Sequence, residues 1–230
     1  MSNQIAQWPT SGAMNASASR HKVLRNTYAL LALSMLPTVL GAWLGVSTGL
    51  GAALGGPVSA VVFLVGAFGF MFAIERYKHS GAGVALLLAF TFFMGLMLSR
   101  MVGTVMGLSN GAQLIMTAFG GTAAIFLVMA NLATVIKRDL SGMGKWLFMG
   151  AMVVLVGGLI NLFVGSTIGM AVISTLAMAV FSGFLLFDLK RIIDGGEDNY
   201  ISATLSLYLS LYNIFQSLLA LLGIFGGERD

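Results

Sequence analysis

Apolar residues run along this chain in long stretches, separated by short polar or glycine-rich segments. A helix needs about 17 to 25 apolar residues to cross the hydrocarbon core of a bilayer. Stretches of that length lie at residues 27–46, 57–74, 82–100, 111–135, 146–164, 167–189 and 203–225. Strands of a membrane barrel would be about half as long and would alternate polar with apolar positions. The pattern therefore predicts an all-α membrane protein, a seven-transmembrane-helix bundle.

Composition supports a membrane location. The chain is 58% hydrophobic and 9% charged, whereas about 25% of residues are charged in an ordinary soluble domain. So few charged side chains cannot cover the surface of a soluble globule. There are no cysteines and only two histidines, which excludes disulfides and the usual zinc sites. We expect no cofactor, and the sequence leaves other metals unknown.

The basic residues indicate an orientation. If the N-terminus is cytoplasmic, ten of the twelve lysines and arginines fall in cytoplasmic segments, and only Arg100 and Arg229 lie on the other side. Cytoplasmic loops of membrane proteins carry such an excess of basic residues. The net charge of +4 is therefore interpreted as a topology signal, and no nucleic-acid partner is expected because no segment supplies a folded basic face.

The chain divides into two parts of different composition. Residues 1–22 are small and polar, carry no charge before Arg20, and lack the basic and apolar regions of a signal peptide. We expect a flexible cytoplasmic tail over residues 1–22 and a seven-helix transmembrane domain over residues 23–230. Such a tail can be inert or can be a handle for a partner, and its composition leaves both readings open.

Catalysis is not expected. An aspartyl intramembrane protease needs two carboxylates that share a site, but Asp188 is the only acid within a predicted span. A serine nucleophile needs a base, and His21 and His79 both fall in loops. No glycine-rich segment ends in the Lys-Ser/Thr of a phosphate-binding loop. We therefore assign no catalytic residue.

Polar residues inside the predicted spans are few, and several share one face of the last helix. The members of this polar seam are Ser206, Ser210, Asn213 and Ser217. Their spacing of four, three and four residues confines them to a narrow stripe at about 100° per residue. Tyr208, Tyr212 and Phe215 fall on roughly the opposite side. The seam either packs helices through small side chains and hydrogen bonds or lines a path for cations.

Two glycine pairs lie within the predicted spans, Gly120–Gly121 and Gly157–Gly158. Small residues let transmembrane helices approach closely. We interpret both pairs as helix contacts.

Asp188 needs compensation. A carboxylate within a bilayer is costly, and this one lies near a predicted helix C-terminus, where the helix dipole disfavours negative charge. Arg191, three residues later, can pair with Asp188 and draw it to the membrane interface. Alternatively, Asp188 is a proton-sensitive latch inside the bundle. The residues alone leave these two readings equal.

Three segments carry a resemblance to a known family. They are HKVLRNTYALLALS, KRDLSGMGKWL and FDLKRIIDGGEDNYISATLSLYLSLYNIFQSLLALLG. With these segments the chain resembles the Bax inhibitor-1 family, also called the transmembrane Bax inhibitor motif family, and within it a bacterial branch that modulates the FtsH protease. The resemblance implies a central helix surrounded by six others in the bacterial inner membrane, with a cytoplasmic N-terminus and a periplasmic C-terminus.

The same resemblance implies two functions. The first is a regulatory protein that binds the FtsH protease complex through its tail, surrounded by membrane lipid. The second is a pH-sensitive leak channel for Ca²⁺ or another cation, because some relatives close such a pore with two aspartates and an arginine. By resemblance, the first aspartate falls on Asp188 and the arginine on Arg76. The second falls on Ser210, which cannot share a proton. Asp188, Arg76 and Arg191 form the candidate charge latch.

Overall fold

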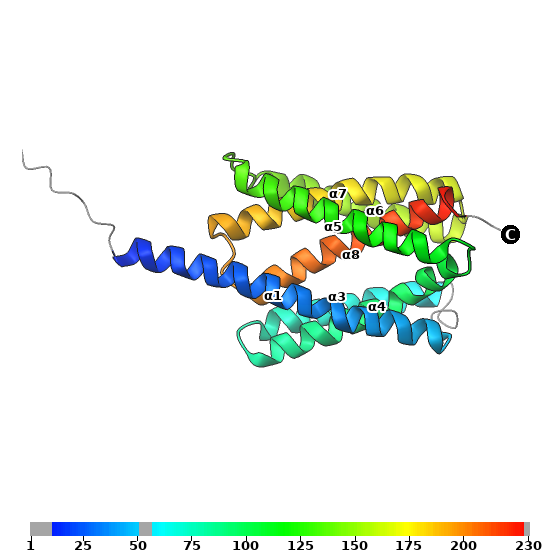
Figure 1. Ribbon diagram of the computed structural model, residues 1–230, viewed down its shortest axis with the longest axis horizontal. Helices are drawn as coiled ribbons and strands as arrows, with labels where there is room; N and C mark the ends of the chain where they lie inside the picture. The colour runs from blue at the N-terminus through cyan, green and yellow to red at the C-terminus, as the bar shows by residue number, and fades with distance from the viewer. Residues whose placement is uncertain (1–10, 51–56, 228–230) are drawn as a thin grey trace, which may run out of the picture.

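The computed structural model describes residues 11–50 and 57–227, which form seven α-helices and no strand (Figure 1). In chain order they are α1 (Ser11–Ser47), α3 (Pro57–Tyr77), α4 (Gly81–Met106), α5 (Gly111–Val135), α6 (Met143–Val164), α7 (Thr167–Asp194) and α8 (Tyr200–Phe225). Each contains a stretch long and apolar enough to cross a membrane. The predicted all-α, seven-helix fold is confirmed.

The helices differ from the predicted spans mainly at their ends. Helix α4 continues past residue 100 to Met106, and α7 continues past residue 189 to Asp194. Hydropathy marks only the part of a helix that fits hydrocarbon, while backbone hydrogen bonds carry the helix further. The largest difference is in α1, which begins at Ser11, inside the predicted tail of residues 1–22. Residues 1–10 of that tail lie outside the described part of the chain.

Two layers of helices enclose α8 (Figure 1). Helices α1, α3 and α4 form one layer, α5, α6 and α7 form the other, and α8 crosses between them. Helix α8 packs against α1 and α4 on one side and against α5 and α7 on the other. Residues 201–205 of α8 are all buried, which covers a full turn, whereas α6 has no buried residue. Helix α8 is therefore the central helix that the family resemblance implies.

The core surrounds α8. Leu207 and Ile214 of α8 are fully buried, together with Phe90 of α4 and Leu185 and Leu189 of α7. In hydrocarbon, apolar side chains gain little from leaving lipid, so these contacts stabilise the bundle mainly through close packing. The packing fixes α8 between the two layers.

Helices α1 and α4 make backbone contacts through glycine. A Cβ atom on Gly95 would collide with the carbonyl oxygen of Thr38, and one on Gly41 would collide with the carbonyl oxygen of Phe92. Small residues make such close helix approach feasible in membranes. The closest helix contacts therefore lie at single glycines that the sequence analysis did not select.

The glycine pairs that were selected match the structure in part. A Cβ on Gly121 would lie 3.1 Å from Leu218 of α8, and one on Gly157 would lie 3.5 Å from Ile173 of α7. Nothing lies within 4 Å of a Cβ on Gly120 or Gly158. One member of each pair faces a neighbouring helix, and the interpretation is wrong for the other, because adjacent residues of a helix point about 100° apart.

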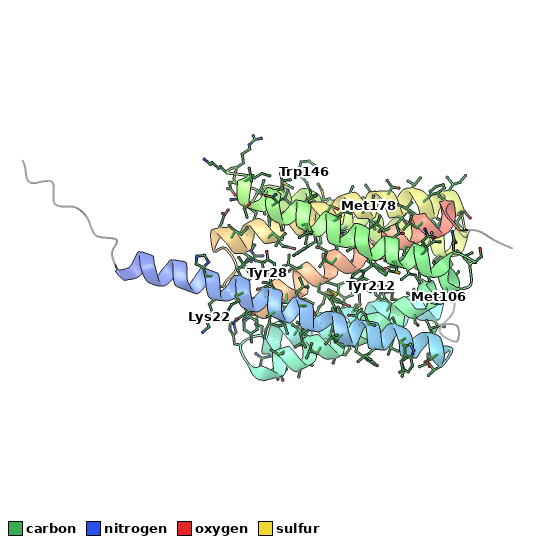
Figure 2. The ribbon with its side chains drawn as sticks, in the orientation of Figure 1. Lys22, Tyr28, Met106, Trp146, Met178 and Tyr212 are labelled. Atoms are coloured by element: carbon green, nitrogen blue, oxygen red, sulfur yellow. The ribbon has the colours of Figure 1, made fainter. Side chains whose placement is uncertain are left out.

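Basic residues gather at one end of the bundle, at the left in Figure 1, where the α3–α4, α5–α6 and α7–α8 loops lie. Figure 2 shows Lys22 at this end and Met106 at the opposite one. We call it the basic end. Arg76 and Lys78 belong to its α3–α4 side, and Lys190 and Arg191 to its α7–α8 side. This grouping agrees with the charge pattern, and the cytoplasmic placement of this end stays a prediction.

Candidate functional site

Asp188 lies in the last two turns of α7 and is partly buried. Its predicted partner Arg191 binds elsewhere. The Arg191 guanidinium is 3.1 Å from the Glu197 carboxylate, and its Nε donates to the carbonyl oxygen of Gly196 at 3.2 Å. Arg191 acts on Asp188 only through space. Within residues 11–50 and 57–227, Asp188 therefore has no ion pair and no hydrogen bond through its side chain.

Arg76, the other predicted partner, lies exposed in the last turn of α3. The structure does not bring Arg76 into an ion pair with Asp188. Its neighbour Glu75 instead pairs with Lys78 at 2.8 Å. The three members of the candidate charge latch are thus not joined to one another, and the latch role of each remains a prediction.

Among the residues that the structure describes, three ion pairs lie at the basic end. They are Glu75–Lys78, Lys190–Asp194 and Arg191–Glu197. The hydrogen bond from Lys78 to Glu75 raises the pKa of the lysine above its ordinary value. Each pair has at least one partner open to solvent, so each contributes about 0 to 1 kcal/mol. The Glu75–Lys78 pair joins the last turn of α3 to the α3–α4 loop, and the other two pairs lie around the end of α7.

Asn199 joins two loops at the basic end. Its Oδ1 accepts hydrogen bonds from the backbone N–H groups of Ile201 at 2.9 Å and Ser202 at 3.2 Å, which caps α8. Its Nδ2 donates to the carbonyl oxygen of Lys78 at 2.9 Å, across the bundle in the α3–α4 loop. Asn199 is not among the site residues predicted from sequence. The available signal was an asparagine directly before an apolar helix, which is typical of an N-cap.

Asp139 shapes the α5–α6 loop at the same end. Its two carboxylate oxygens accept hydrogen bonds from the backbone N–H and the hydroxyl of Ser141, each at 2.8 Å. These bonds favour the charged form and lower the pKa of Asp139 below its ordinary value. The backbone N–H of Met143 donates to the carbonyl oxygen of Leu140 at 2.8 Å, which closes a turn where α6 begins.

The side chains of the polar seam of α8 are buried or half-buried within the bundle. Ser210 is 3% exposed and Ser217 is 6% exposed, while Ser206 and Asn213 are half-buried. The Nδ2 of Asn213 donates to the carbonyl oxygen of Leu209 in its own helix at 2.8 Å. In the described chain, no side-chain hydrogen bond of the seam reaches another helix. The burial of Ser210 and Ser217 favours helix packing, and a cation path along the seam stays a prediction.

Hydrogen bonds between helices lie on the aromatic side of α8 instead. The Tyr208 hydroxyl is 2.9 Å from Thr38 Oγ1 of α1 and 3.4 Å from the carbonyl oxygen of Thr91 in α4. The Tyr212 hydroxyl donates to the carbonyl oxygen of Met94 at 3.3 Å, and Figure 2 shows Tyr212 between the two layers. A buried tyrosine usually needs a hydrogen-bond partner, and that was the signal the sequence contained.

Comparison with known proteins shows which family has this sequence pattern. The family profile described as "Inhibitor of apoptosis-promoting Bax1" matches residues 20–227. The chain belongs to the Bax inhibitor-1 family. The chain is also 38% identical to "Modulator of FtsH protease YccA" of Escherichia coli K12, over 92% of this chain and 93% of that one.

Other relatives are similar over nearly the whole chain. An uncharacterized protein of Neisseria meningitidis is 37% identical over 92% of this chain and 95% of its own. One of Pseudomonas aeruginosa is 34% identical over 98% of this chain and 99% of its own. The protein matching YccA in a second Escherichia coli strain, also 38% identical, is named an inner membrane protein. With seven helices able to span a bilayer, the chain is a multi-pass protein of the bacterial inner membrane.

Proposed function

We propose that this protein regulates the FtsH membrane protease, which it binds in the inner membrane and whose degradation of membrane substrates it slows. One observation carries the proposal. The chain is 38% identical, over 92% of its length, to a protein named a modulator of FtsH protease. A similarity of that extent is not confined to one motif. It includes the central helix and both layers around it.

The N-terminal segment is the proposed contact with the protease. Helix α1 begins at Ser11 and projects beyond the basic end of the bundle (Figure 1). The family match begins at residue 20, so most of this segment lies before the part of the chain that the family profile covers. A polar segment that leads away from the membrane helices is accessible to the parts of a protease that lie outside the bilayer.

Deleting residues 2–20 is expected to lower the amount of FtsH that copurifies with the protein by several-fold. The measurement is affinity capture from detergent-solubilised inner membranes, with a tag after residue 230 and equal amounts of each variant. The matched control keeps the length of the segment and scrambles the order of residues 2–20. Undiminished capture by the deletion variant contradicts the role of the segment, and absence of FtsH from every capture contradicts the partnership itself.

A second candidate function rests on Asp188. A carboxylate within a membrane-spanning helix is costly, and such groups mark ion or proton pathways. Asp188 has no ion pair among the described residues, which favours a cation leak with Asp188 as the charged group of the path. The buried Ser210 cannot supply the second carboxylate of a paired gate, so the proposed leak depends on Asp188 alone.

Replacing Asp188 by asparagine is expected to reduce calcium flux and to remove its dependence on pH. The measurement is flux into liposomes that contain the purified protein and a trapped calcium indicator. Asp194→Asn is the control, because it removes an acid of the same helix that is paired with Lys190 at the surface. Equal flux through the wild-type protein and Asp188→Asn at every pH excludes Asp188 from ion conduction.

A further inference from the structure

A cavity of about 200 Å³ lies between α3, α4 and α8, in the half of the bundle away from the basic end. Its walls include Ser59 and Phe63 of α3, Leu96 and Arg100 of α4, and Tyr212 and Gln216 of α8. Helix α3 packs mainly on α4 and makes few contacts with α8. The cavity is therefore the space between α3 and the central helix. Its lining includes both apolar side chains and the cationic side chain of Arg100.

Arg100 is the charged group of this cavity. Its side chain is exposed and makes no ion pair or hydrogen bond to the described residues. The acidic residues of the described chain all belong to the basic end or its loops. They are Glu75, Asp139, Asp188, Asp194, Glu197 and Asp198. The protein thus places a guanidinium in a cavity wall and supplies no described carboxylate to neutralise it.

Arg100 lies close enough to the end of α4 for its side chain to contact an anion at the membrane interface. Arg100 lies six residues before Met106, the end of α4, which corresponds to about 9 Å of helix at about 1.5 Å per residue. An arginine at this depth can extend its side chain to the headgroup region. The guanidinium is planar and offers paired donors that match phosphate oxygens.

A second polar group lies next to this cation. Gln216 of α8 lines the same cavity, and its side-chain amide makes no hydrogen bond within residues 11–50 and 57–227. It can donate to a phosphate or glycerol oxygen. Phe63 and Leu96 supply apolar wall beside these groups, which suits an acyl chain. A molecule with a phosphate at one end and hydrocarbon at the other can contact both the polar and the apolar side chains of the cavity.

We propose that this cavity binds an anionic phospholipid of the leaflet opposite the basic end, with its phosphate on Arg100 and part of an acyl chain between α3 and α8. Charge complementarity selects an anionic lipid, because a zwitterionic headgroup carries its own cation, which competes with Arg100 for the phosphate. The site is independent of the regulation of FtsH.

The test uses the full-length protein, purified in detergent and stripped of native lipid. Native mass spectrometry measures the affinity for phosphatidylglycerol, phosphatidylcholine and glycerol phosphate. We expect phosphatidylglycerol to bind more tightly than phosphatidylcholine, and Arg100→Gln to weaken its binding by about 10-fold or more, as expected for loss of a charged hydrogen bond. Arg100→Lys keeps the charge and should retain most of the affinity.

Lys145→Gln is the matched control, because Lys145 is an exposed cation at the basic end. It should leave the affinity for phosphatidylglycerol unchanged. Equal losses for Arg100→Gln and Lys145→Gln overturn the proposal in favour of general charge attraction, and no loss for Arg100→Gln overturns it outright. If glycerol phosphate binds as tightly as phosphatidylglycerol, the acyl chain contributes nothing to binding. That result overturns the proposal of a lipid site in favour of a site for a free anion.

Discussion

Replacing Gly95 by alanine is expected to destabilise the protein by about 1–3 kcal/mol, the usual range for overpacking a core, although it adds only one methyl group. The new Cβ atom would collide with the carbonyl oxygen of Thr38 and lie 3.0 Å from the backbone nitrogen of Ala42. Both are backbone atoms of α1, so no side-chain rotation relieves the contact. Helices α1 and α4 must separate, and the Thr38–Tyr208 hydrogen bond would be strained as they do.

The measurement is the thermal unfolding midpoint in detergent, followed by circular dichroism. Gly69→Ala is the control, since a Cβ on Gly69, in α3, meets nothing within 4 Å. Alanine favours helix over glycine by up to about 1 kcal/mol, so Gly69→Ala should be neutral or stabilising. Equal midpoints for the two variants would show that α1 and α4 are not packed backbone to backbone.

Replacing Asn199 by alanine is expected to destabilise the protein by a similar amount. The substitution removes the N-cap of α8, which is worth about 0.5–2 kcal/mol. It also removes the hydrogen bond to the carbonyl oxygen of Lys78, for which the net contribution is about 0.5–1.5 kcal/mol. Because α8 is the central helix, loosening its first turn should weaken both layers.

Asn199→Asp separates these two contributions. Aspartate accepts the hydrogen bonds from Ile201 and Ser202 but has no donor for Lys78, so its unfolding midpoint should fall between those of wild type and Asn199→Ala. Asn131→Ala, at an exposed position of α5, should change the midpoint little. An Asn199→Ala midpoint equal to that of wild type would contradict a structural role for this cap.

The seven helices could be predicted from sequence because the bilayer fixes their length. The apolar run of residues 203–225 locates α8 (Tyr200–Phe225) to within three residues. The start of α1 could not be found in this way. Residues 11–22 are mostly small or polar, and the helix there continues outside the apolar run that hydropathy detects. A continued helix leaves no apolar signature where it does not meet lipid.

Sequence distance alone could not predict the partner of Arg191. Three residues separate Arg191 from Asp188, which is a favourable spacing on one helix. However, α7 ends at Asp194, and Gly195 adopts the left-handed region with a φ of 81°. That turn brings Glu197 back to Arg191. The two glycines after Asp194 indicate a turn, but they do not predict which side chain beyond the turn lies close to Arg191.

The faces of α8 were predicted better than their roles. Spacing separated Ser210 from Tyr208 and Tyr212, and the structure places them on different sides. Helical spacing does not say what each side contacts, however. A central helix has neighbours on every side, so both faces contain buried residues. The hydrogen bonds to α1 and α4 lie on the aromatic face, opposite the polar seam.

The half-life of a known membrane substrate of FtsH tests the central claim most directly. It should be measured after synthesis is stopped, in cells that overproduce this protein and in cells that lack it, with FtsH amounts confirmed equal. Cells without active FtsH provide the control, since the protein should have no effect on the substrate there. Regulation of FtsH predicts a longer half-life when the protein is overproduced. An unchanged half-life in cells with active FtsH would contradict it.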